Sequence, residues 1–164
     1  MELHMQSHRW APQVPNWPAA AVAGFTAGAV MMVLELLWAA LVVGASPWTI
    51  SHMLAAIVMG PDVLQSTDFS FNIVALALAT HYVLGIVFGI ILSAIIASFH
   101  FDSSASMVLL IGAAFGLVLY LFNFYGMVRF FPWFADLRGW PTLATHLAFG
   151  MTAALMYWKL EPRD

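Results

Sequence analysis

Residues 72 to 98 read NIVALALATHYVLGIVFGIILSAIIAS, a run without a single aspartate, glutamate, lysine or arginine. As an α-helix rising about 1.5 Å per residue it would be about 40 Å long, more than the roughly 30 Å hydrocarbon core of a bilayer. Such a run is typical of a membrane-spanning helix, because a helix satisfies its own backbone polar groups in lipid. Three further apolar runs are expected to cross as well: Pro18 to Val43, Met107 to Arg129, and Thr142 to Trp158 at the short limit.

The composition of the whole chain agrees with these runs. Of 164 residues, 63% are hydrophobic and only 8% are charged, and the mean hydropathy is +0.90. These values exclude a water-soluble domain, which is about 45–50% apolar and about 25% charged. The absence of cysteine excludes disulfides and thiolate chemistry. A net charge of −3 and the lack of a Lys/Arg run argue against a nucleic-acid partner.

The chain is expected to fold as an all-α membrane protein, with four transmembrane helices in an antiparallel bundle and a short interfacial helix between the first two. Residues 1–17 contain Pro12 and Pro15 and are expected to form an irregular tail. Residues 18–158 form the single transmembrane domain, and residues 159–164 a C-terminal tail. Only a few residues separate the second and third runs, which predicts a tight helical hairpin, with Ser104 or Ser106 capping the third helix.

Two shorter segments are expected to cover one end of the bundle. Ser46 to Met59 reads as a helix too short to cross, capped by Ser46 and stopped by Gly60-Pro61. Phe130 to Pro141 is rich in aromatic residues, which favour the headgroup layer. Both lie on the same side of the membrane and would form a lid that carries His52.

Basic residues indicate the orientation. Arg9, Lys159 and Arg163 lie in the tails, against Arg129 and Arg138 in the last loop. This excess predicts a multi-pass protein with both termini cytoplasmic.

Four polar residues are expected to lie inside the membrane. Glu35 is the one charged residue well within an apolar run, and an intramembrane acid is a functional-site candidate by default. His81, Asn123 and His146 lie in the other three runs. The rise per residue places all four in the same half of the bilayer, roughly 6 to 14 Å below the lid.

Glycines indicate which helix faces point inward. Residues four and seven apart share a face, and each polar residue shares its face with glycine, as Tyr120 does in the third run. GxxxG spacing lets helix backbones approach closely in lipid. The glycines expected at helix contacts are Gly24, Gly28, Gly85, Gly89, Gly112, Gly116 and Gly150. The pattern predicts a polar cluster of Glu35, His81, His146, Asn123 and Tyr120 inside the bundle.

These motifs resemble those of small bacterial inner-membrane proteins of the YagU-like kind. The features that carry the resemblance are Gly24 to Gly28, the short helix Ser46 to Met59, His81 to Gly85, Gly112 to Gly116, and His146 to Gly150. The resemblance covers nearly the whole chain from Phe25 to Tyr157. It implies a four-span fold and a place in the bacterial inner membrane, and it brings no established activity with it.

Three functional hypotheses follow. The small extramembrane mass favours an accessory or assembly subunit of a larger membrane complex, with other membrane subunits or further copies of the chain as partners. The polar cluster favours a small transporter or conduit for an ion, a proton or a solute, with Glu35 and His81 as its working groups. The third hypothesis is a metal or haem cofactor held by Glu35, His81 and His146, with His52 or methionine as a further ligand.

A purely structural role for the polar residues and an enzymatic role are the alternatives. Glu35 and His81 could serve structure alone, by hydrogen-bonding to each other or to the backbone and so setting the bundle register. An enzyme is not expected, because the sequence lacks a nucleophile elbow, an HExxH helix and a phosphate-binding loop.

Overall fold

The computed structural model describes residues 14–44 and 46–161, and over these ranges the protein is helical and has no strand. The tail residues Arg9, Pro12 and Arg163 lie outside the described residues. The α-helices are α1 (Trp17–Trp38), α2 (Trp48–Met59), α3 (Phe71–Phe99), α4 (Ala105–Leu121) and α5 (Trp140–Leu160). The connecting π and 3-10 turns are η1 (Ala39–Val43), η2 (Pro61–Gln65), η3 (Phe122–Gly126), η4 (Met127–Arg129) and η5 (Pro132–Leu137).

Three helical stretches are long and apolar enough to cross a membrane. They are Trp17–Val43, Phe71–Phe99 and Ala105–Arg129, and they match the first three predicted runs within two residues at each end. The fourth run forms α5, which is not among these stretches because it carries more polar residues, including His146 and Lys159. The predicted all-helical fold with helices long and apolar enough to cross a membrane is confirmed for the described residues, and four crossings in an antiparallel bundle stay a prediction.

The helix ends follow local side-chain chemistry. Asn16 Oδ1 accepts from the Ala19 amide at 3.2 Å at the start of α1, and Ser104 Oγ accepts from the Met107 amide at 3.2 Å at the start of α4. Of the two serines considered for the latter position, Ser104 is therefore the cap. Before α2, Ser46 Oγ accepts from the Trp48 amide at 3.3 Å. Gly60, with φ +90°, ends α2 in a conformation that side chains disfavour.

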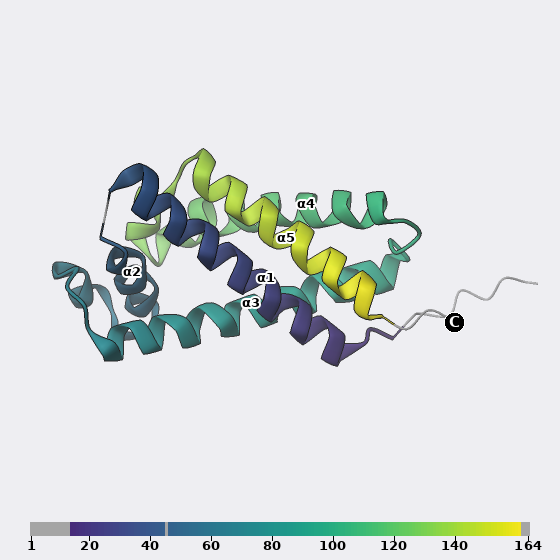
Figure 1. Ribbon diagram of the computed structural model, residues 1–164, viewed down its shortest axis with the longest axis horizontal. Helices are drawn as coiled ribbons and strands as arrows, with labels where there is room; N and C mark the ends of the chain where they lie inside the picture. Colours follow the sequence, from purple (N-terminus) through teal and green to yellow (C-terminus); the bar gives the residue numbers. More distant parts are fainter. Residues whose placement is uncertain (1–13, 45, 162–164) are drawn as a thin grey trace, which may run out of the picture.

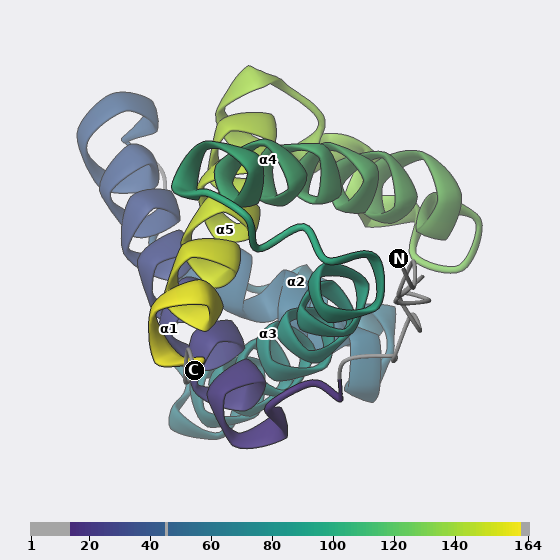
Figure 2. The same cartoon turned by 90° about the vertical axis from the view of Figure 1, so that its right-hand side faces the viewer.

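The four long helices pack side by side in the order α3, α1, α5 and α4, rather than around a common axis. α1 and α5 lie side by side in the middle, α3 packs on α1, and α4 packs on α5 (Figures 1 and 2). The prediction of a tight hairpin holds only for the turn between α3 and α4. Beyond that turn the two helices diverge and make few contacts with each other, because their close-packing faces are turned toward α1 and α5.

Glycines set these close packings. A Cβ on Gly24 would overlap the carbonyl oxygen of Gly85 in α3, and one on Gly89 would overlap Gly24 in return. On the other side of the molecule, a Cβ on Gly116 would overlap the carbonyl oxygen of His146 in α5. A Cβ on Gly28 would lie at an ordinary contact distance of 3.6 Å from His81, whereas Gly112 and Gly150 face each other so closely that a Cβ on either would overlap the other. Only glycine permits such backbone approach.

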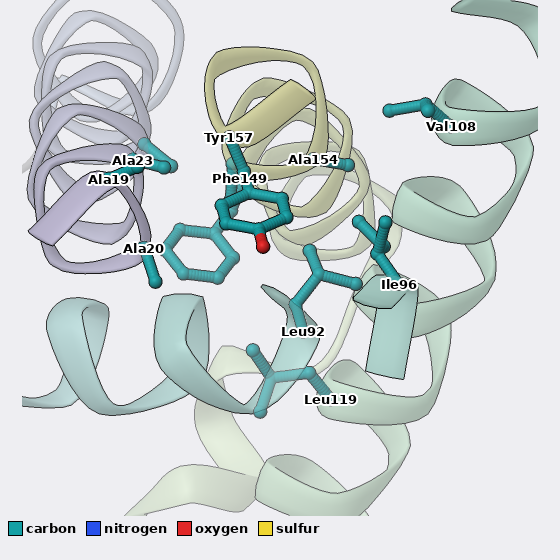
Figure 3. Packing of buried hydrophobic residues seen from close by; sticks show 12 residues of the cluster. Ala19, Ala20, Ala23, Leu92, Ile96, Val108, Leu119, Phe149, Ala154 and Tyr157 are labelled. Carbon is teal, nitrogen blue, oxygen red and sulfur yellow. The ribbon is translucent and has the colours of Figure 1, made fainter. Parts of the chain in front are cut away.

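The solid core lies at the end of the molecule where both termini lie. Leu92 and Ile96 of α3 pack with Phe149 and Tyr157 of α5, against small alanines of α1 (Figure 3). The Tyr157 hydroxyl accepts from the Asn16 amide at 3.3 Å and donates to Glu161 Oε1 at 2.8 Å. The start of α1 and the end of α5 are therefore fastened together.

Gly150→Ala tests the packing between α4 and α5. The new methyl group would overlap the backbone of Gly112, so we expect the variant to lose about 1 to 3 kcal/mol of unfolding free energy. Gly126→Ala is the control, because its Cβ would meet only a Phe122 ring carbon at 3.8 Å. The measurement is helix loss in a denaturing-detergent titration of purified protein. Equal losses in both variants would show that the α4–α5 approach is not close.

Candidate functional site

A cavity of about 740 Å³ occupies the end of the molecule away from the termini. α1, α2, α3 and α5 line it together with η3 and η5. It exists because α3 and α4 diverge from their shared turn and leave room between their far ends. Glu35, His81, Asn123 and His146, which the sequence placed at similar depth, all line this one cavity.

Glu35 is the acidic side chain of the cavity wall formed by α1. Thr145 of α5 has its hydroxyl 3.4 Å from Glu35 Oε1 and 2.9 Å from the Thr142 carbonyl oxygen. A hydroxyl carries one proton, and the two acceptors compete for it, so the longer bond to Glu35 is the weaker one. Within residues 14–44 and 46–161, Glu35 has this one hydrogen-bond partner and no ion pair.

His81 connects α3 to α1 across the same cavity. Its Nε2 lies 2.9 Å from the carbonyl oxygen of Gly28 and donates to it. A Cβ at Gly28 would lie 3.6 Å from Nε2, which is an ordinary van der Waals contact, so this hydrogen bond does not require glycine. Glu35 is bonded to Thr145 and His81 to the backbone, so the two residues do not bond to each other.

His146 of α5 and Asn123 of η3 form a second polar group in the cavity lining. His146 Nδ1 donates to the Thr142 carbonyl oxygen at 2.8 Å, and Asn123 Nδ2 lies 3.4 Å from His146 Nε2. With Nδ1 as donor, Nε2 is the acceptor, so His146 is neutral in this arrangement. Tyr120 does not line the cavity. Its ring packs edge-on behind His146 at 6.0 Å between centroids, and its hydroxyl accepts from the Gly139 amide.

The structure does not assemble the predicted metal ligands. Among the described residues, no group of three or more His, Cys, Asp or Glu side chains is arranged to hold a metal ion. Glu35, His81 and His146 line the same cavity, but a Thr142 carbonyl occupies His146 Nδ1 and a Gly28 carbonyl occupies His81 Nε2. The metal and haem hypothesis therefore gains no support from the geometry.

The lid segments meet at the cavity end of the molecule. Trp133 Nε1 in η5 donates to the Met53 carbonyl oxygen in α2 at 3.1 Å, which joins the two elements that the sequence placed on one side. Arg138 Nε donates to the Phe124 carbonyl oxygen at 2.7 Å, and its guanidinium lies 4.5 Å from the centre of the Tyr125 ring. These bonds fix the segment from η3 to η5 over the cavity.

His52 lies in the lid but does not line the cavity. Its side chain is buried, with Nδ1 2.6 Å from the Val63 carbonyl oxygen and Nε2 2.9 Å from the Asp68 carbonyl oxygen. Both partners can only accept, so each bond requires a proton on the ring nitrogen concerned. His52 fastens α2 to residues 61–68 rather than facing a ligand.

Sequence reasoning missed several cavity residues. Thr145, Asp136 and Arg138 all line the cavity, and none of them was predicted to do so. Thr145 could have been found from its position next to His146 in an apolar run, where a hydroxyl is a second polar group at the same depth. Asp136 and Arg138 carried no such signal, because a loop residue has no periodicity to show where it points.

The chain has no match among known proteins in the three comparisons made: no family model, no curated protein and no solved structure matches it. The YagU-like resemblance therefore stays a prediction. The functional conclusion has to come from the cavity itself.

His52→Ala tests the fastening of the lid. Loss of both ring bonds should raise backbone amide exchange at residues 61–68 by about tenfold or more, since two hydrogen bonds contribute about 0.5 to 1.5 kcal/mol each. Ser51→Ala, on the same helix, is the control. Hydrogen–deuterium exchange with mass spectrometry is the readout, and unchanged exchange in His52→Ala would rule out the fastening role.

Proposed function

We propose that this chain is a non-catalytic membrane protein with four crossings in an antiparallel bundle, and that it binds a small amphipathic solute in its cavity, as a transporter does when it loads its substrate. The observation that carries the proposal is a single one. Glu35, His81, Asn123 and His146, from four different helical segments, line one mainly apolar cavity.

Both the size and the lining of the cavity favour a small molecule. Ligand sites have volumes of about 300 to 1,000 Å³ and apolar walls with a few convergent polar groups. The volume of about 740 Å³ lies in that range. A membrane-buried acid is costly, and interhelical hydrogen bonds in membranes are worth only about 0.6 kcal/mol on average. The weak bond from Thr145 does not offset that cost, which favours a ligand-binding role for Glu35 over a purely structural one.

The contacts between α1 and α5 support the fourth crossing. Asn16 meets Tyr157 at one end of the pair, and Glu35 meets Thr145 toward the other. α5 therefore runs alongside α1 in the opposite direction over most of its length. If α1 spans the hydrocarbon core, α5 lies at the same depths and spans it too, and both termini fall on one side, proposed to be the cytoplasmic side of a bacterial inner membrane.

Cysteine labelling tests the four crossings. The chain contains no cysteine, so each introduced thiol is unique. Val14→Cys and Lys159→Cys should react with a membrane-impermeant maleimide from one face, and Asp62→Cys from the other. Inside-out and right-side-out vesicles identify the faces. Reaction of positions 14 and 159 from opposite faces would indicate an odd number of crossings.

Filling the cavity tests solute binding. The probe is triphenylphosphine oxide, a neutral molecule with apolar rings and one strong acceptor, measured by equilibrium dialysis against protein in lipid nanodiscs with empty nanodiscs subtracted. We expect saturable binding that Leu54→Trp, on the cavity wall, weakens at least about tenfold. Val58→Trp, on the same helix and 62% exposed, is the matched control. Binding that neither variant changes would contradict a solute site in this cavity.

The accessory-subunit hypothesis stays a prediction that composition supports. Migration as an isolated monomer on a blue-native gel after mild extraction would count against it.

A further inference from the structure

The charge of the cavity points to the class of solute. Glu35 has a hydrogen-bond partner in Thr145 and no cationic partner among the described residues. A carboxylate in an apolar site is stabilised by an opposite charge more than by any neutral group. Since no residue in the described ranges supplies such a charge beside Glu35, a ligand can supply it.

The basic groups near the cavity do not satisfy Glu35. Arg138 is exposed at the rim, with its Nε on the Phe124 carbonyl oxygen and its guanidinium over the Tyr125 ring. His146 is neutral, because its Nε2 accepts from Asn123. His81 donates from Nε2 to Gly28. Asp136, also at the exposed rim, adds a second carboxylate to the lining.

The rest of the wall suits an aromatic or apolar cation. Aromatic rings from five elements line the cavity, namely Trp38, Phe88, Phe124, Phe134 and Phe149. The face of an aromatic ring carries negative charge and attracts cations, most strongly when both are removed from water. An apolar wall also favours burial of the hydrocarbon part of a ligand at about 25 cal/mol per Å². A small hydrated ion would gain nothing from this wall.

We propose that the cavity binds hydrophobic organic cations, with the positive centre beside Glu35 and the apolar groups against the aromatic wall. This inference rests on the proposed solute-binding function and specifies the ligand. A quaternary ammonium or phosphonium ion with aromatic groups has the required chemistry. An anion of the same shape is excluded by the two carboxylates and the ring faces.

Two ions of matched shape and opposite charge test the assignment. Tetraphenylphosphonium and tetraphenylborate differ in charge but not in their four phenyl groups, so apolar burial is the same for both. Each is titrated against wild-type protein in nanodiscs of zwitterionic lipid, with empty nanodiscs subtracted. We expect saturable binding of tetraphenylphosphonium at least about tenfold tighter than that of tetraphenylborate.

Glu35→Gln should weaken tetraphenylphosphonium binding at least about tenfold and remove most of the preference for this cation over tetraphenylborate. Asp62→Asn is the matched control, since it removes an exposed acid that is not part of the cavity. The circular dichroism of each variant shows whether it is folded. If Glu35→Gln does not fold, Glu35→Asp replaces it and should weaken the cation while keeping its preference over the anion.

The outcomes separate the two proposals. Binding of the neutral probe that Leu54→Trp removes, combined with equal affinity for the two ions, would overturn the cation assignment and leave the solute site in place. Failure of all three probes to bind in a manner sensitive to Leu54→Trp would overturn both. Tighter binding of tetraphenylborate would likewise reject the cation assignment.

Discussion

The close approach of helix backbones at glycine is the constraint on which the rest of the structure depends. In lipid, apolar side chains gain little by leaving one apolar environment for another, so helices associate through close van der Waals contact. Gly24 with Gly85 and Gly89, and Gly116 with His146, hold α3 to α1 and α4 to α5. α3 and α4 are thereby bound to different partners, and they diverge from their common turn (Figure 1).

This divergence divides the molecule into a solid end and a hollow end. Near the termini, Leu92, Ile96, Phe149 and Tyr157 fill the interior (Figure 3). Toward the lid the same helices are too far apart to fill the space, and α2 and η5 close it without packing it solid. The polar groups lie in this hollow half, where they have hydrogen-bond partners and where Glu35 still faces open volume.

The positions of the long helices and of several helix ends could be predicted from sequence, because hydropathy and periodicity are local properties. The three most apolar runs appear as helices, and Ser46, Gly60 and Ser104 act at helix ends where their chemistry places them. The tight turn between α3 and α4 was predicted correctly, but the expectation that the two helices pack against each other along their length was wrong. A short connection brings only the ends of two helices together. Each helix then packs along its length against the neighbour that its glycine face can approach most closely.

The depth and face of Glu35, His81, Asn123 and His146 were determined by the sequence itself, since rise per residue and helical periodicity place a side chain on its own helix. Tertiary structure alone decided which groups meet. It paired Glu35 with Thr145, His81 with the Gly28 carbonyl, and His52 with Val63 and Asp68 outside the cavity. Hydrogen bonds act over about 3 Å, and the sequence does not specify the relative shifts and rotations of helices to that precision.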